Sequence, residues 1–196
     1  THYELALALD PAHAEAQHNL GFLQQRANRL DEALARYLRA QALKPGYADA
    51  EGNEGLTRLV MGDFETGWDR YEARWNRPGN QRRTLPAPAW DGGDLAGKTI
   101  LLHAEQGLGD AIQFVRYAAL VKALGATVVF ECAPSQERLF RGVAGIDRLV
   151  PAGSPLPRFD VHAPLLGLPR LLKTRLESIP ADVPYLKAEP EPAAAW

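Results

Sequence analysis

From residue 98 onward the chain alternates two hydrophobic patterns. Short runs of consecutive apolar residues are typical of strands that are buried on both faces. Between the first two runs, Ile112, Val115 and Ala119 recur at helical spacing until Gly125 ends the helix. The apolar runs lie at residues 99–104, 127–132, 146–150 and 159–163. Strands that alternate with helices predict a parallel sheet with right-handed crossovers.

Residues 1–75 carry a helical pattern that repeats itself. Identical residue types return 34 positions later at several places, which is the period of a pair of antiparallel helices. Small residues in these repeats suit the close approach of paired helices, and Pro suits the helix ends. The recurring residues are Tyr3, Tyr37 and Tyr71, then Ala6 and Ala40, Pro11 and Pro45, Asn19 and Asn53, and Gly21 and Gly55.

The stretch AEAQHNLGFLQQRANRLDEALARYLRAQALKPG resembles the tetratricopeptide family. Residues 1–75 then comprise about two and a half units, of which the second is less regular. Glu54 stands where the first unit has Leu20, and Gly67 stands where it has Ala33. An incomplete array is marginal alone, which favours binding to a partner protein or self-association.

The resemblance implies a peptide-binding groove lined by the first helix of each unit. Asn19 and Asn53 would lie above one another there, as in the repeats of O-linked N-acetylglucosamine transferases, with His18, Phe22 and Arg26 nearby. Asparagine amides both donate to and accept from a peptide backbone. In the alternative interpretation these asparagines serve only local helix packing.

Residues 76–97 are rich in Pro, Gly and polar side chains, which predicts a linker. We interpret the basic residues around it as a solvated cluster rather than a phosphate site, and Trp90 as an anchor on the next domain. The basic residues are Arg74, Arg77, Arg82 and Arg83.

Polar side chains follow the predicted strands of residues 98–188. A doubly wound order would place the second and third strands on one side of the first, and the fourth strand on the other. In such sheets ligands bind beyond the carboxyl ends of the strands, where the order reverses. We therefore predict a ligand site that includes His103, Glu105, Glu131 and His162.

The first strand leads into the loop Gln106-Gly107-Leu108-Gly109-Asp110. Its two glycines permit a tight turn and a close approach of the backbone to a ligand, so Gln106, Gly107 and Gly109 join the predicted site. A dinucleotide loop needs a small third residue, but Ile112 stands there and Asp110 would repel a pyrophosphate. We expect Asp110 to begin the next helix as its N-cap.

The stretch GKTILLHAEQGLGDAIQFVRYAALVKALGA resembles the opening of heptosyltransferase-like glycosyltransferases, and more narrowly bacterial proteins that join such a domain to tetratricopeptide repeats. The resemblance implies a two-domain GT-B fold, a nucleotide-sugar donor, and Asp110 as general base for the acceptor hydroxyl. Residues 98–188 would be the N-terminal Rossmann-like half, and 189–196 the start of a crossover to a second domain. We expect this segment alone to be inactive, with no cofactor of its own.

Composition narrows the class of protein further. The formal net charge is −2 and is evenly divided along the chain, which argues against nucleic acid as a partner. No apolar run approaches the roughly 20 residues that span a bilayer. With Cys132 as the single cysteine, these features predict a cytoplasmic protein. The histidines lack metal-ligand spacing, so no metal is expected.

Two functions follow from the sequence. The first is a glycosyltransferase-like protein whose repeats recruit a partner and whose α/β domain contributes the acceptor side of the transfer site. The alternative is a tetratricopeptide scaffold without catalysis. Whether the complete protein is an enzyme is left open by the sequence.

Overall fold

A computed structural model describes residues 1–187. The chain divides into two compact units. The first, called the repeat unit below, comprises residues 1–83 and 173–177. The second, the sheet unit, comprises residues 84–172 and continues from Ser178. The predicted crossover at 189–196 lies outside the described residues. Helical repeats followed by a parallel sheet with helices confirm the predicted α plus α/β architecture.

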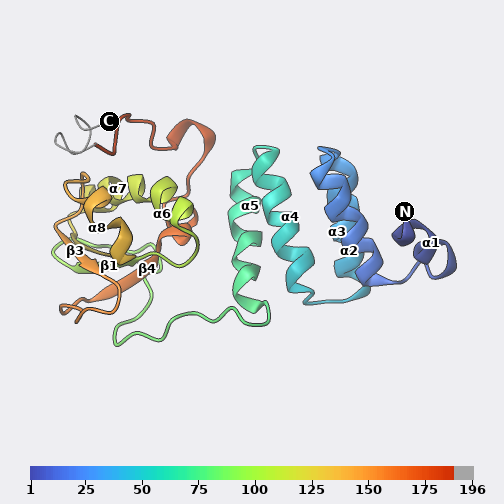
Figure 1. The fold of residues 1–196 in the computed structure, drawn as a ribbon, viewed down its shortest axis with the longest axis horizontal. Coiled ribbons are helices and arrows are strands. Elements are labelled where there is room, and N and C mark those ends of the chain that lie inside the picture. Colours follow the sequence, from blue (N-terminus) through green and yellow to red (C-terminus); the bar gives the residue numbers. More distant parts are fainter. Residues whose placement is uncertain (188–196) are drawn as a thin grey trace. The chain divides into compact units, whose positions relative to one another are not determined.

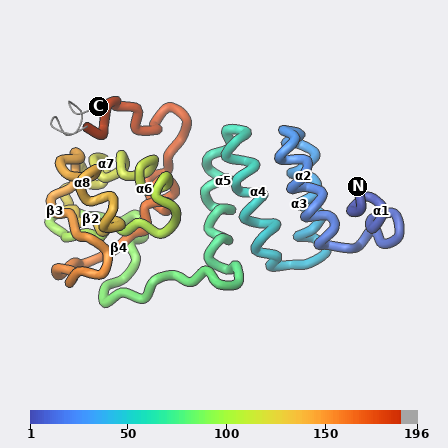
Figure 2. The backbone as a smooth tube through the Cα atoms, in the orientation of Figure 1, coloured from blue at the N-terminus to red at the C-terminus, as the bar shows by residue number. Residues whose placement is uncertain are grey.

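The repeat unit consists of antiparallel helix pairs, as the 34-residue period predicts (Figures 1 and 2). Helix α1 begins at a capping box in which Thr1 and Glu4 bond each other's backbone. Proline follows both α1 and α3 closely, where a helix cannot continue. The elements are α1 (His2–Leu9), α2 (Ala14–Arg26), α3 (Leu30–Leu43), α4 (Ala48–Val60), α5 (Phe64–Tyr71) and the 3₁₀ helix η1 (Glu72–Asn76).

Glycine makes the close approach within each pair of helices possible. A Cβ atom added at Gly21 of α2 would lie 3.0 Å from the side chains of Arg36 and Tyr37 on α3. In the second pair the contact is tighter, because a Cβ atom at Gly55 would lie 2.6 Å from the backbone nitrogen of Tyr71. Tyr37 fills the core of the first pair and is fully buried. The predicted role of Gly21 in helix packing is confirmed.

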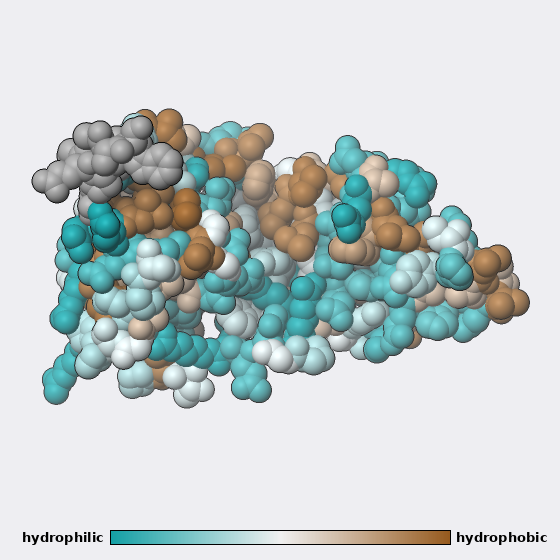
Figure 3. Space-filling view, viewed as in Figure 1, coloured by the Kyte–Doolittle hydropathy of each residue, from teal (hydrophilic) through white to brown (hydrophobic). Residues whose placement is uncertain are grey.

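A charged residue in the core distinguishes the second pair from the first. Glu54 replaces a leucine there and is fully buried. Its carboxylate is paired with Arg58 Nε at 2.7 Å and accepts a hydrogen bond from Gln41 Nε2 at 2.9 Å. A buried carboxylate is tolerated only with such partners. Separately, exposed hydrophobic residues lie at the surface near the end of α4, among them Val60 and Met61 (Figure 3).

The sheet unit alternates strands and helices as the sequence predicts, with strand bounds that differ by one or two residues. Short helical segments replace the long regular helix that the spacing between 108 and 124 suggests. The elements are β1 (Thr99–His103), α6 (Leu108–Phe114), η2 (Val115–Tyr117), α7 (Ala118–Ala123), β2 (Thr127–Cys132), η3 (Pro134–Gln136), α8 (Glu137–Phe140), β3 (Arg148–Pro151), β4 (Val161–Pro164), η4 (Leu165–Gly167) and α9 (Leu168–Leu171). A further 3₁₀ helix, η5, spans Leu176–Ser178.

The four strands are parallel and lie in the order β3-β2-β1-β4, which confirms the predicted reversal beside β1. Leu101 pairs with Val129 on β2 and with His162 on β4. One face of the sheet carries a core of Leu101, Val129 and Val150, against which Leu85, Leu156 and Phe159 pack from segments outside the strands. The carboxyl ends of β1 and β4 are therefore direct neighbours.

Trp90 fixes the segment that precedes β1. Its side chain is 5% exposed, and its indole Nε1 donates a hydrogen bond to the carbonyl oxygen of Gly93 at 2.9 Å. Its backbone nitrogen donates to the carbonyl oxygen of His162 on β4 at 2.8 Å. The predicted anchoring role of Trp90 is confirmed. Among residues 1–187, no helix is both long enough and apolar enough to cross a bilayer.

Candidate functional site

Two histidines meet at the carboxyl edge of the sheet. His103 ends β1 and His162 lies in β4, and their facing nitrogens, His103 Nε2 and His162 Nδ1, are 3.3 Å apart. The ring centroids are 5.4 Å apart. Such a contact is a hydrogen bond when one facing nitrogen carries a proton and the other does not. The two predicted site residues are thus brought together at the point where the strand order reverses.

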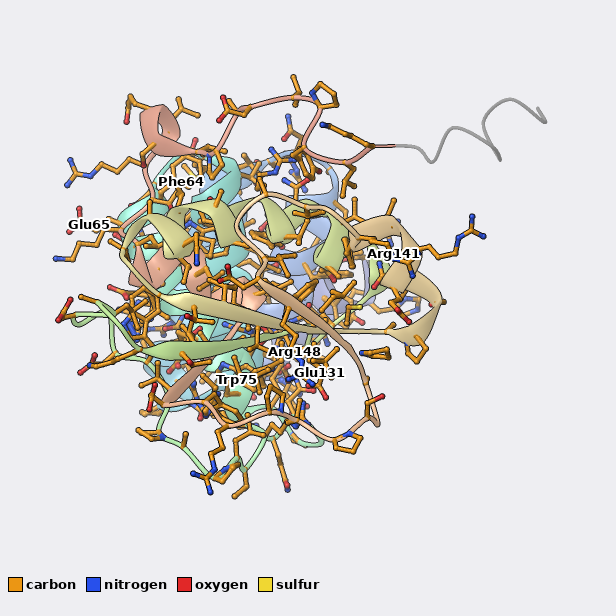
Figure 4. The ribbon with its side chains drawn as sticks, turned by 90° about the vertical axis from the view of Figure 1, so that its left-hand side faces the viewer. Phe64, Glu65, Trp75, Glu131, Arg141 and Arg148 are labelled. Carbon is orange, nitrogen blue, oxygen red and sulfur yellow. The ribbon has the colours of Figure 1, made fainter. Side chains whose placement is uncertain are left out.

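Glu131 belongs to the same face of the sheet, because it is the register partner of His103 on β2. Both residues are only 4% exposed. Figure 4 shows Glu131 and, on the neighbouring strand β3, the exposed Arg148. Glu131 is therefore buried beside His103 at this edge of the sheet. Glu105, two residues beyond β1, is partly buried, and Gln106 is exposed.

Asp110 lies at the start of α6 but does not cap it as predicted. Gly107 is the N-cap residue, and Asp110 is the third residue of the helix. The Asp110 carboxylate reaches back, and its Oδ2 accepts a hydrogen bond from the backbone nitrogen of Gly107 at 3.0 Å. The prediction of Asp110 as the N-cap was wrong because the helix begins three residues earlier than expected. Within the described chain, Asp110 Oδ1 makes no hydrogen bond.

The two glycines after β1 do not adopt the positive φ angles for which turns usually require glycine. Gly107 has φ −64°, and neither it nor Gly109 is among the residues with positive φ. A Cβ atom at Gly109 would meet no atom within 4 Å, and one at Gly107 would lie 3.3 Å from Asp110 Oδ2. The fold itself therefore does not require glycine at 109, which leaves an open surface beside Asp110.

Gln136 is a residue of this edge that the sequence analysis missed. It lies between β2 and α8 and is 4% exposed. Its Nε2 donates to the carbonyl oxygen of Leu108 at 2.9 Å, which holds the first residue of α6 in place. Its Oε1 is buried with no hydrogen-bond partner in residues 1–187. A glutamine after a strand is too common to signal this role.

The repeat unit carries a second candidate site, in which one histidine connects the two predicted asparagines. His18 Nδ1 is 3.2 Å from Asn19 Oδ1, and His18 Nε2 is 3.0 Å from Asn53 Nδ2. A neutral imidazole with its proton on Nδ1 satisfies both contacts, as donor to Asn19 and acceptor from Asn53. The structure thus brings three of the predicted groove residues together. Phe22 and Arg26 are exposed, one and two turns further along α2.

Burial and charge both act on His18. Desolvation lowers the pKa of His18, and the Arg77 guanidinium also lowers it, against the opposing effects of the Asn19 hydrogen bond and the Asp49 carboxylate. The imidazole lies between two tyrosine rings, with centroid distances of 5.7 Å to Tyr37 and 5.2 Å to Tyr47. Burial also favours the neutral form of Tyr37, because it raises the pKa of this side chain to about 12. The neutral form of His18 is the one that this surface favours.

Arg77 continues this polar chain. Its Nη2 donates to Asn53 Oδ1 at 3.1 Å, and its Nε lies 3.1 Å from Asp49 Oδ1. Arg74 is 2% exposed, with its guanidinium over the rings of Tyr71 and Trp75. The prediction of a solvated basic cluster was therefore wrong for these two arginines, because rings and carboxylates of the repeat unit bind them. The exposed Arg82 fits it better, although it pairs with Glu72 at 2.7 Å.

The class of protein is thus a helical repeat joined to a parallel α/β sheet. Protein FlbA of Caulobacter vibrioides is 27% identical over 217 aligned positions, which cover 99% of this chain and 36% of that protein. The chain therefore spans about a third of the length of this curated relative. A mutant O-GlcNAc transferase of Thermobaculum terrenum is 18% identical, with a TM-score of 0.38, over 79% of this chain and 37% of that one. No protein-family model matches the chain.

Proposed function

We propose that this chain is part of a glycosyltransferase-like protein. Its repeat unit binds a protein or peptide, and its sheet unit contributes the acceptor side of a nucleotide-sugar-dependent transfer site. The sequence resemblance to heptosyltransferase-like proteins suggests this chemistry, and the observation that carries it is the state of Asp110. One carboxylate oxygen is bound to Gly107, while the other makes no hydrogen bond in the described chain.

This arrangement suits a general base. The bond between Asp110 Oδ2 and the Gly107 backbone fixes the carboxylate, and Oδ1 is left to accept the proton of an acceptor hydroxyl. As the proton leaves, the hydroxyl oxygen bonds to the anomeric carbon of the donor, and the bond from that carbon to the nucleotide diphosphate breaks. Asp110 lies in α6, the helix that follows β1, and ligands bind beyond the carboxyl ends of the strands in sheets of this order, which supports the proposal.

The alternative function is a repeat scaffold without catalysis. The observation that favours it is the same hydrogen bond, because a carboxylate at the third position of a helix stabilises the helix start without any further role. In that case Asp110 matters for stability alone.

The substitution Asp110→Asn separates these functions in the complete protein. Asparagine keeps a side-chain oxygen for the Gly107 backbone, so we expect unfolding temperature to change little. It cannot accept a proton, so we expect sugar transfer to fall by about 10²–10⁴-fold, the usual contribution of a general base. Transfer is measured with radiolabelled nucleotide-sugars and the proteins of the source cell as acceptors.

Asp160→Asn is the matched control, because Asp160 Oδ2 also accepts a backbone hydrogen bond, from Thr99 at the opposite end of β1. We expect full transfer from this variant. Unchanged transfer in Asp110→Asn would refute the general-base role and favour the scaffold.

A further inference from the structure

Helix α4 presents a surface that is complementary to a planar cation. Asp49 supplies a carboxylate and a backbone carbonyl, and Asn53, one turn later, supplies an amide oxygen. Gly52 between them is buried in the middle of the helix, where glycine normally costs stability. A Cβ atom at Gly52 would lie 2.6 Å from Arg77 Nη2, so a side chain there would collide with the guanidinium. We call these three residues the α4 seat.

Arg77 occupies the α4 seat incompletely. Its Nη2 bonds Asn53 Oδ1 at 3.1 Å and lies 3.4 Å from the carbonyl oxygen of Asp49. Its Nε is 3.1 Å from Asp49 Oδ1, but it is buried and the N–H makes no hydrogen bond in the described chain. A buried donor without an acceptor carries a desolvation cost. Arg77 therefore binds the α4 seat with imperfect hydrogen-bond geometry at Nε.

The position of Arg77 also permits exchange. It follows the last residue of η1 and precedes a segment, 78–98, without helix or paired strand except the bridge at Ala89. The Asp49 side chain is 47% exposed and the Arg77 side chain is 26% exposed, so the pair is partly open to solvent although Arg77 Nε itself is buried. Ion pairs that are partly exposed to solvent contribute little to stability. A competing arginine side chain can therefore reach the α4 seat, and the Arg77–Asp49 ion pair that it must displace is weak.

We propose that the α4 seat is a guanidinium-binding site, which Arg77 fills in the free chain and an arginine side chain of a bound peptide fills in its place. This rests on the proposed role of the repeat unit in peptide binding, and it defines the chemistry of the partner. Arginine is favoured over lysine because a planar group with several fixed N–H donors matches a carboxylate, a carbonyl and an amide oxygen together. Displacement of Arg77 also frees Asn53 Oδ1 for the peptide.

The test uses the chain of residues 1–196 and a fluorescent heptapeptide, acetyl-Gly-Ser-Gly-Arg-Gly-Ser-Gly-amide. Removing the internal competitor in Arg77→Ala should tighten binding of this peptide by about tenfold in fluorescence anisotropy. Peptides with lysine or neutral citrulline in place of arginine should show little of this gain. Adding Asp49→Asn to Arg77→Ala should abolish the gain. Arg82→Ala is the control, because Arg82 pairs with Glu72 and makes no hydrogen bond or ion pair with Asp49 or Asn53 in the described chain.

A second measurement covers the case in which Arg77→Ala unfolds. In the unsubstituted chain, saturating arginine peptide should shift the NMR signal of the Arg77 Nε–H group, and the citrulline peptide should not. The proposal is overturned if arginine peptide binds both proteins equally, if lysine, citrulline or aspartate peptides gain as much, or if the Arg77 signal does not move. Loss of sugar-transfer activity has no bearing on these outcomes, so failure of the proposed catalysis is distinguishable.

Discussion

His18 shows how one residue depends on its neighbours for a single protonation state. Its two ring nitrogens need opposite roles, donor toward Asn19 and acceptor from Asn53. A proton added at Nε2 would face the Asn53 amide N–H. Turning the Asn53 amide over would instead place its N–H groups toward the guanidinium of Arg77. In each alternative two hydrogen-bond donors face each other, so this arrangement of hydrogen bonds favours the neutral form of His18.

We expect the substitution Arg77→Ala to raise the pKa of His18, because the guanidinium charge lowers it in the native chain. A histidine whose folded pKa lies below the unfolded value contributes stability above the unfolded value of about 6.5, and this is lost as pH falls through the folded pKa. The variant should therefore lose less stability between pH 6.5 and 5. NMR titration of the His18 ring measures the shift, and an unchanged or lower pKa would contradict the placement of Arg77.

A substitution at Gly109 separates the requirements of the fold from those of a bound ligand. An added methyl group there meets no atom within 4 Å, and alanine favours helix over glycine by up to about 1 kcal/mol. We expect Gly109→Ala to raise the unfolding temperature slightly while lowering sugar transfer in the complete protein, because the methyl group obstructs the surface beside Asp110. Calorimetry and the transfer assay check the two effects. Undiminished transfer would show that no substrate approaches this loop.

At the scale of elements, the two helix pairs differ in how closely they approach. We expect Gly55→Ala to destabilise the repeat unit by about 1–3 kcal/mol, because the added Cβ atom would lie 2.6 Å from the backbone of α5, which cannot rotate away. Gly21→Ala should cost less, since its nearest contacts at 3.0 Å include side-chain atoms that can shift. Urea unfolding followed by circular dichroism gives both values. If both substitutions lowered the free energy of unfolding equally, α4 and α5 would have to move apart to accommodate the methyl group.

The elements themselves were largely predictable, and their side-chain connections were not. The 34-residue period and the alternation of apolar runs fixed the helix pairs and the strand order, because periodicity reports directly on burial. The meeting of His103 and His162 followed from that order. Arg77 was misjudged because its partners lie 24 and 28 residues away, beyond any local pattern. A mid-helix glycine at 52 was the available signal of a close approach.

At the scale of the molecule, the chain combines two compact units with separate candidate sites. The polar chain from Asn19 to Arg77 belongs to the repeat unit, whereas His103, His162 and Asp110 belong to the sheet unit. The proposed peptide binding and the proposed catalysis are therefore separable by single substitutions, Asp49→Asn for the first and Asp110→Asn for the second.

The buried Glu54 has a consequence for assembly of the repeats. Helix pairs of similar sequence can pack against the wrong helix during folding, or against a helix of another molecule. A swap that placed α4 against the wrong neighbour would separate the buried Glu54 carboxylate from Gln41 on α3 and Arg70 on α5, whereas Arg58 on α4 would stay beside it. A buried carboxylate that loses hydrogen-bond partners costs stability. The buried Glu54 therefore favours the native neighbours of α4, α3 and α5, over wrong pairings of the helices.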